Sequence, residues 1–115
     1  MENFMFCFHE KLEIRDLGKG VLLKSLGVGS NMNALHWDMA AGSEVPLHSH
    51  PHEQFGYVIK GGFDMVIGTE RATLKAGDCY FIPSDLPHGF TAIGETEAID
   101  VFSPVREGLP GDKKE

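Results

Sequence analysis

Residues 56–68 of the chain read GYVIKGGFDMVIG, and this stretch decides the fold class. Beyond the Gly61–Gly62 pair, an apolar side chain recurs at every second position from Phe63 to Ile67. Alternate side chains of a β-strand point to opposite faces, so a period of two is typical of a strand with one buried face. Glycine pairs are typical of tight turns, and the stretch therefore predicts a β-hairpin that turns at Gly61–Gly62.

The rest of the chain repeats this period. In ALHWDM, residues 34–39, large apolar side chains alternate with His36 and Asp38, and no window of helix length has a 3.6-residue period. Short apolar segments separated by turn residues are typical of a β-sandwich or a small β-barrel. We expect one all-β domain over residues 1–115, with N-terminal strands over about 1–30, a barrel core over 31–104 and a C-terminal tail over 105–115.

The charge balance excludes several kinds of partner. Asp and Glu number 17 against 10 Lys and Arg, which gives a formal net charge of -7. Nucleic acids and anionic membrane surfaces attract basic proteins, so we expect neither as a partner. The amino-terminal residues lack the basic region of a signal peptide, and no apolar run approaches the length of a membrane span. We therefore expect a cytoplasmic protein.

The cysteines and the first apolar run carry further predictions. Cys7 and Cys79 share no motif spacing, and we expect both to be reduced, buried thiols. The apolar run from Phe4 to Phe8 predicts either a strand that covers the core or an edge strand that pairs with a second subunit. We favour the second alternative, which implies a homodimer.

Three of the six histidines lie in HSHPHEQ, residues 48–54. His48 and His50 would share one face of an extended strand, roughly 6.5 Å apart, a span that two imidazoles can close around one ion. Gln54 would lie about 13 Å further along a straight strand, but Pro51 allows a bend that returns the chain. His88, in IPSDLPHGF, offers a third imidazole. Three imidazoles and one amide oxygen would leave open the coordination positions that a catalytic metal requires.

The same residues fit a known pattern. GSEVPLHSHPHEQFGYVIKG (42–61) resembles the first cupin motif, and GDCYFIPSDLPH (77–88) resembles the second. The resemblance covers roughly residues 40–92 and implies a single-domain cupin, which is a jelly-roll barrel or double-stranded β-helix. It also implies one divalent metal ion, with zinc, nickel, manganese and iron all compatible. The implied metal ligands are His48, His50, Gln54 and His88.

The fourth of these ligands departs from the family pattern, which usually has Glu where this chain has Gln54. An amide offers an oxygen but no charge, so the full charge of a divalent ion would face the cavity and attract a substrate carboxylate. His52 and Glu53 are the competing ligands. The family spacing favours Gln54, and we expect Glu53 to face outward.

The segment AIDVFSPVREG, residues 98–108, allows two orientations. In one, Ile99 and Val101 face the core and Asp100 lies in water, as most aspartates do. In the other, Asp100 and Phe102 face the barrel interior. Arg106, beyond the Pro104 bend, would then stand at the barrel mouth, where a guanidinium can bind a carboxylate in bidentate fashion.

HSHPHEQ followed by DVFSPVRE resembles the KdgF-type family of small cupins, which act in pectin and alginate breakdown. The resemblance implies metal-dependent conversion of 4,5-unsaturated monouronates to the linear 5-keto-4-deoxyuronate by ring opening and tautomerisation. It implies Asp100 and Arg106 as catalytic residues, and Phe102, Arg106 and Gln54 as contacts to a small carboxylated sugar. Two alternatives remain: a cupin dioxygenase acting on a small organic substrate, and a sugar-binding cupin without catalysis.

Overall fold

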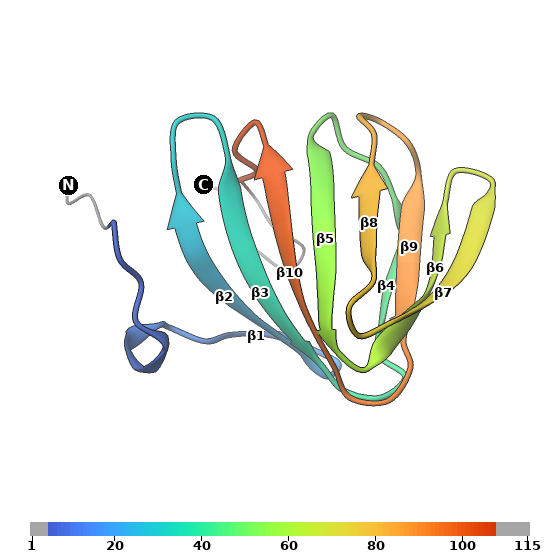
Figure 1. Ribbon diagram of the computed structural model, residues 1–115, viewed down its shortest axis with the longest axis horizontal. Coiled ribbons are helices and arrows are strands. Elements are labelled where there is room, and N and C mark those ends of the chain that lie inside the picture. Colours follow the sequence, from blue (N-terminus) through green and yellow to red (C-terminus); the bar gives the residue numbers. More distant parts are fainter. Residues whose placement is uncertain (1–4, 108–115) are drawn as a thin grey trace.

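The computed structural model describes residues 5–107, and almost all of its regular structure is antiparallel β-sheet (Figure 1). The elements are η1 (His9–Lys11), β1 (Arg15–Gly18), β2 (Val21–Val28), β3 (Asn33–Met39), β4 (Glu44–His48), β5 (Glu53–Lys60), β6 (Gly62–Ile67), β7 (Glu70–Lys75), β8 (Cys79–Ile82), β9 (His88–Ala92) and β10 (Thr96–Ser103). Over these residues, no helix has the length and apolar character needed to cross a membrane.

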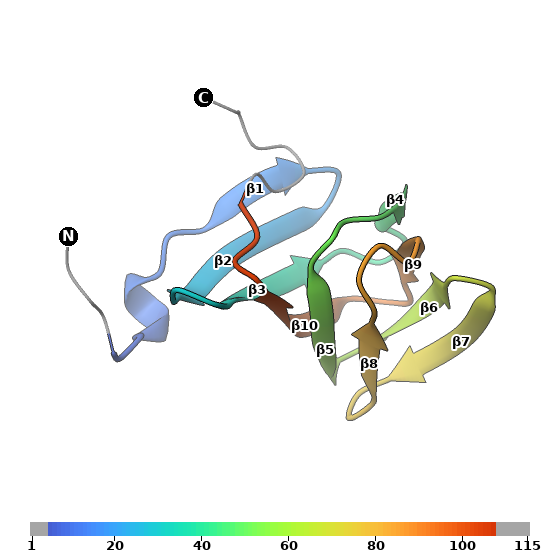
Figure 2. The same ribbon diagram turned by 90° about the horizontal axis from the view of Figure 1, so that it is seen from above.

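Two sheets make up the fold. The first has the order β1-β2-β3-β10-β5-β8 and the second has the order β4-β9-β6-β7. Figure 2, seen from above, shows the second sheet lying across from the β10-β5-β8 part of the first. The expected all-β fold is confirmed, and the arrangement of antiparallel sheets is that of a jelly-roll.

The core lies between the sheets and follows the period of two. Along β3 every odd-numbered residue is buried and every even-numbered one is half-buried, so Leu35, Trp37 and Met39 point inward as the sequence predicts. Phe63 and Met65 on β6 face them from the second sheet as members of the same apolar cluster. This packing supports the strands that carry the candidate site.

The hairpin predicted at Gly61–Gly62 is wrong, although the two strands exist. β5 pairs with β10 and β8, whereas β6 pairs with β9 and β7, so Gly61 is a corner at which the chain passes between the sheets. The φ of Gly61 is +77°, in the region that glycine tolerates best. The Thr96 hydroxyl accepts from Gly62 N at 3.1 Å and donates to Gly62 O at 2.9 Å, which anchors the corner to β10.

The amino-terminal segment also differs from expectation. Phe4 lies outside the described residues, and the rest of the run forms no strand: Met5, Phe6 and Phe8 are exposed. Cys7 and Cys79 are free, as expected, but both are exposed rather than buried. Cys79 begins β8, where alternation with the buried Tyr80 turns its side chain outward.

Candidate metal centre

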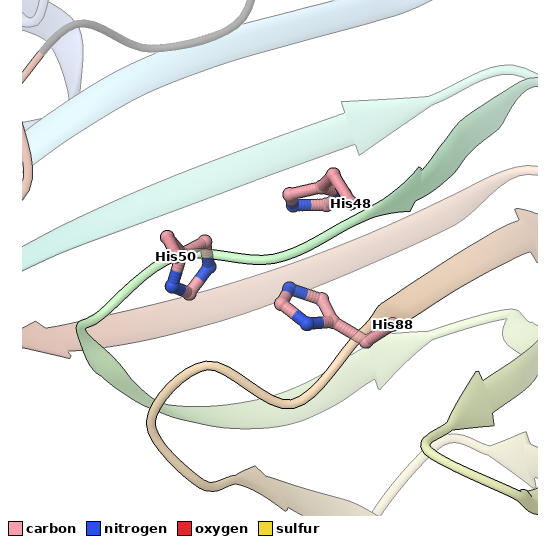
Figure 3. Close-up of side chains that lie close together, drawn as sticks. All are labelled: His48, His50 and His88. Atoms are coloured by element: carbon pink, nitrogen blue, oxygen red, sulfur yellow. The ribbon is translucent and has the colours of Figure 1, made fainter.

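The imidazoles of His48, His50 and His88 lie close together (Figure 3). His48 ends β4, His88 begins β9 as its register partner, and His50 lies in the loop between β4 and β5. The ring centroid of His88 lies 4.3 Å from that of His48 and 4.8 Å from that of His50. One ring nitrogen of each lies within 4.8 Å of the others, so the three could ligate one ion.

Backbone hydrogen bonds orient the three rings. Each Nδ1 faces a carbonyl oxygen two residues away: Pro46 O at 2.8 Å from His48, His52 O at 3.1 Å from His50, and Leu86 O at 2.9 Å from His88. A carbonyl oxygen only accepts, so each Nδ1 carries the proton and donates it. Each Nε2 therefore keeps its lone pair, which is the tautomer that metal-binding histidines adopt when Nδ1 is held by a backbone oxygen.

Protein groups do not satisfy all of these Nε2 lone pairs with hydrogen bonds. His88 is fully buried, and its Nε2 has no hydrogen-bond partner among the described residues. Burial is the largest cause that lowers the pKa of His88 from 6.5 to about 4, and it also lowers the pKa of His50. Neutral imidazoles are the ligand form, and an unpartnered buried acceptor is costly, so the three rings fit a cation well.

The side chain of Gln54 lies beside the imidazole of His50, as predicted from the sequence. Its Oε1 lies 3.1 Å from Nε2 of His50, and only 4% of the residue is exposed. The loop through Pro51 returns the chain so that Gln54, at the start of β5, reaches the same point. An amide oxygen and an imidazole lone pair are both acceptors, and a shared cation stabilises two acceptors that face each other. Glu53 is exposed, as expected.

Asp100 lies inside the barrel, so the second of the two orientations considered for β10 occurs. Asp100 and Phe102 are fully buried, whereas Ile99 and Val101 are half-buried on the other face. The Tyr80 hydroxyl donates to Asp100 Oδ1 at 2.7 Å, and Oδ2 has no hydrogen-bond partner among the described residues.

The surroundings of Asp100 make its carboxyl a weaker acid than an ordinary aspartate. Burial raises the pKa of its carboxyl from 3.8 to about 6, because a charge in a dry interior is costly. Neighbouring groups oppose that rise in the pKa by favouring the charged form. These are the hydrogen-bonding side chains of Tyr80, Gln54 and Trp37, and the positive charge of Arg106. A buried carboxyl with a pKa near neutrality is typical of a proton-transferring group.

Arg106 lies beside this carboxyl and over an aromatic ring. Its guanidinium carbon is 5.2 Å from the Phe102 ring centroid, and its backbone N–H donates to Asn33 Oδ1 at 2.8 Å. Partial burial lowers the pKa of Arg106, while the charge of Asp100 raises it. The Phe102 ring also meets His50 edge-on, with centroids 5.9 Å apart. The structure therefore brings Asp100, Phe102 and Arg106 together with the imidazoles.

Comparison with known proteins agrees with this geometry. A family model for the cupin domain matches residues 35–102, which is more than half of the chain. The chain belongs to the cupin family. This cupin is 33% identical over 93 residues to the pectin degradation protein KdgF of Dickeya dadantii, covering 79% of this chain and 84% of that protein.

Solved cupin structures are also similar. An RmlC-like cupin from Shewanella frigidimarina superimposes with a TM-score of 0.88 at 34% identity, covering 91% of this chain and 95% of that one. KdgF from a Halomonas species gives a TM-score of 0.86 at 27% identity, covering 91% and 97%. The cupin jelly-roll expected from the two motifs is thus confirmed.

Sequence reasoning missed two residues of this cupin site. Tyr80 holds Asp100, and Asn33 holds the backbone of Arg106. The signal for Tyr80 was available, since period two places it on the same face as the core residue Ile82. A buried tyrosine hydroxyl needs a hydrogen-bond partner, and a buried aspartate is a suitable one. No comparable signal pointed to Asn33.

Proposed function

We propose that this cupin is a metal-dependent enzyme that converts 4,5-unsaturated monouronates, released from pectin or alginate, to the linear 5-keto-4-deoxyuronate. The observation that carries the proposal is the buried carboxyl of Asp100, with one free oxygen, beside the imidazole cluster and Arg106. Similarity to two proteins named KdgF, one described as a pectin degradation protein, supports the substrate class.

The reaction moves one proton and breaks one ring bond. The anomeric hydroxyl loses its proton, C1 becomes a carbonyl, and the bond between C1 and the ring oxygen breaks. That oxygen takes the bonding pair and becomes an enolate on C5. Protonation at C4 then gives the C5 ketone, so substrate and product are isomers. The site must accept a proton at one oxygen and return one at a nearby carbon.

Asp100 suits both transfers. A base with a pKa of about 6 accepts a proton readily near neutral pH and returns it readily, because its two forms are close in free energy. Oδ2 makes no hydrogen bond of good geometry among the described residues, although Gln54 and Trp37 lie near the carboxyl, and we propose that it is the oxygen that takes the proton. Full burial of Asp100 keeps bulk water away from its carboxyl.

The other residues bind and orient the sugar. Arg106 would bind the substrate carboxylate through two parallel hydrogen bonds. We propose that the Phe102 ring packs against the sugar and also supports Arg106 and His50, which lie beside it. His48, His50, His88 and Gln54 would hold the divalent ion. The chemistry that such an ion supplies is stabilisation of negative charge on the substrate oxygens.

One assay separates this function from its alternatives. Purified protein is given an unsaturated monouronate without oxygen, and the loss of the alkene absorbance is followed with and without chelator. The proposal expects rapid loss that chelator abolishes and added metal restores. A dioxygenase would require and consume oxygen. A sugar-binding cupin without catalysis would bind the uronate, measurable by calorimetry, and leave the absorbance unchanged.

We also propose the homodimer that the sequence favours. Phe6 and Phe8 of the amino-terminal segment are exposed, and so are Phe55 on β5 and Phe81 on β8, whose side chains share the outer face of their sheet. A second copy would remove both apolar surfaces from water. Light scattering should give twice the chain mass for the wild-type protein and the single mass for Phe81→Glu. The cytoplasmic location stays a prediction.

A further inference from the structure

We propose that Tyr80 is a positioning residue for Asp100, which it holds through one carboxylate oxygen so that only the other transfers protons. The inference rests on the proposed function, because it assigns a role within that reaction. Its basis is the 2.7 Å hydrogen bond from the Tyr80 hydroxyl to Asp100 Oδ1, between two side chains that are both buried. Short hydrogen bonds to a buried carboxylate are among the stronger ones in proteins.

Gly56 makes this contact possible. On adjacent strands, Tyr80 of β8, Gly56 of β5 and Asp100 of β10 are successive register partners. The tyrosine ring must therefore cross β5 to reach the carboxyl, and it does so directly over Gly56. A Cβ at this position would overlap the ring and hydroxyl atoms of Tyr80. Glycine is required here by the close approach of a side chain rather than by a turn.

The hydroxyl can act only as a donor in this position. Burial is the largest cause that raises the pKa of Tyr80 well above 10.0, and the charge of Asp100 raises it further. The phenol thus keeps its proton near neutral pH. It also meets Phe63 edge-on, with centroids 6.3 Å apart, so packing fixes the ring as well.

The two oxygens of Asp100 consequently have different tasks. Oδ1 accepts a hydrogen bond from the Tyr80 phenol, whereas Oδ2 makes no hydrogen bond of good geometry among the described residues, although Gln54 and Trp37 lie near the carboxyl. A carboxylate that rotates freely would present either oxygen and lose alignment with the substrate. Holding Oδ1 keeps Oδ2 in one direction, and alignment of this kind accounts for large factors in rate.

The deciding experiment compares Tyr80→Phe with Tyr57→Phe. The first removes only the hydroxyl that holds Asp100; the second removes an exposed hydroxyl on β5, outside the site. We expect Tyr80→Phe to lower kcat on the order of 10- to 100-fold while KM and metal content stay within about twofold of wild type. Tyr57→Phe should match wild type in all three.

A second pair of variants tests whether Gly56 is needed for the contact between Tyr80 and Asp100. Gly56→Ala should lower kcat at least as much as Tyr80→Phe, whereas Gly27→Ala should not, because a Cβ at Gly27 meets nothing within 4 Å. A folded Gly56→Ala protein with wild-type kcat would overturn the role given to that glycine.

Failure of the inference and failure of the proposed function give different results. Wild-type kcat in Tyr80→Phe, or a loss that appears in KM or metal content instead, would overturn the inference while the proposed function stands. A wild-type protein that does not turn over uronate would overturn both.

Discussion

His48 and His88 are register partners across β4 and β9, and their ring centroids lie 4.3 Å apart. The strand pairing itself therefore sets the separation of two imidazoles, and backbone carbonyls set the direction of their lone pairs. Both features belong to the folded chain rather than to a bound ion. A site of this kind loses little conformational entropy on binding metal.

Removal of one imidazole should remove the ion. We expect His88→Ala to purify with far less metal than wild type and to lack activity, because one of three nitrogen ligands is gone. His52→Ala is the matched control, since residue 52 offers its backbone oxygen to His50 and that oxygen survives the substitution. Elemental analysis of the purified proteins measures the outcome. Equal metal content in His88→Ala and His52→Ala would contradict the ligand assignment.

Gln54→Glu should retain metal but lose activity. The added negative charge strengthens the bond to the ion and weakens its attraction for a substrate carboxylate. It also places a second carboxyl near Asp100, whose charged form Gln54 favours in the wild-type protein, and so disturbs the base. We expect kcat/KM to fall about tenfold or more, with metal affinity by calorimetry equal or higher. Higher kcat/KM in the variant would show that the neutral ligand has no such role.

Arg106→Lys should affect substrate binding most. Lysine keeps the positive charge but cannot form two parallel hydrogen bonds with a carboxylate, and it loses the planar contact with Phe102. We expect KM to rise roughly 10- to 100-fold, with a smaller change in kcat. Arg71→Lys, at an exposed ion pair with Asp64, is the control and should leave both parameters unchanged. An unchanged KM in Arg106→Lys would remove this arginine from substrate binding.

Asp100→Asn should abolish turnover and stabilise the fold at neutral pH. The pKa of this buried carboxyl is about 6 in the folded protein against an ordinary 3.8. Between these values the folded state holds a proton that the unfolded chain has lost, so the contribution of Asp100 to stability falls as pH rises and is lowest above about pH 6. The asparagine carries no such penalty, and we expect it to gain up to about 3 kcal/mol at pH 7.

This gain should disappear on acidification. Below about pH 4 both forms of the protein hold an uncharged side chain at position 100, so their urea midpoints should converge. His88 has the opposite sign in the same range, since its lowered pKa makes the metal-free fold less stable as pH falls from 6.5 to about 4. The difference between variant and wild type isolates Asp100 because both proteins contain His88. A gain that does not change between pH 7 and pH 4 would contradict the raised pKa.

Local pattern predicted the strands well but not their pairing. The apolar stretches on either side of Gly61–Gly62, with the alternation from Phe63 to Ile67, correctly indicated β5 and β6. It could not show that these strands belong to different sheets. That outcome depends on β10, whose Thr96 lies far along the chain and fixes the corner.

For the metal cluster, in contrast, the sequence predicted both the residues and their proximity. HSHPHEQ and His88 could be read directly, because ligand types and glycine framework agree with a family pattern. Their convergence in three dimensions matches that expectation.

The sequence by itself determined the period of the strands, the donor set of the candidate site and the membership of the chain in the cupin family. Only the tertiary structure decided which face of β10 is buried, and hence that Asp100 is an inward carboxyl with a raised pKa. It also decided that Tyr80 reaches across Gly56 to hold it. The periodicity of a strand indicates that alternate side chains point inward. Which set of side chains points inward, and what they contact, depends on packing between residues that are distant in the chain.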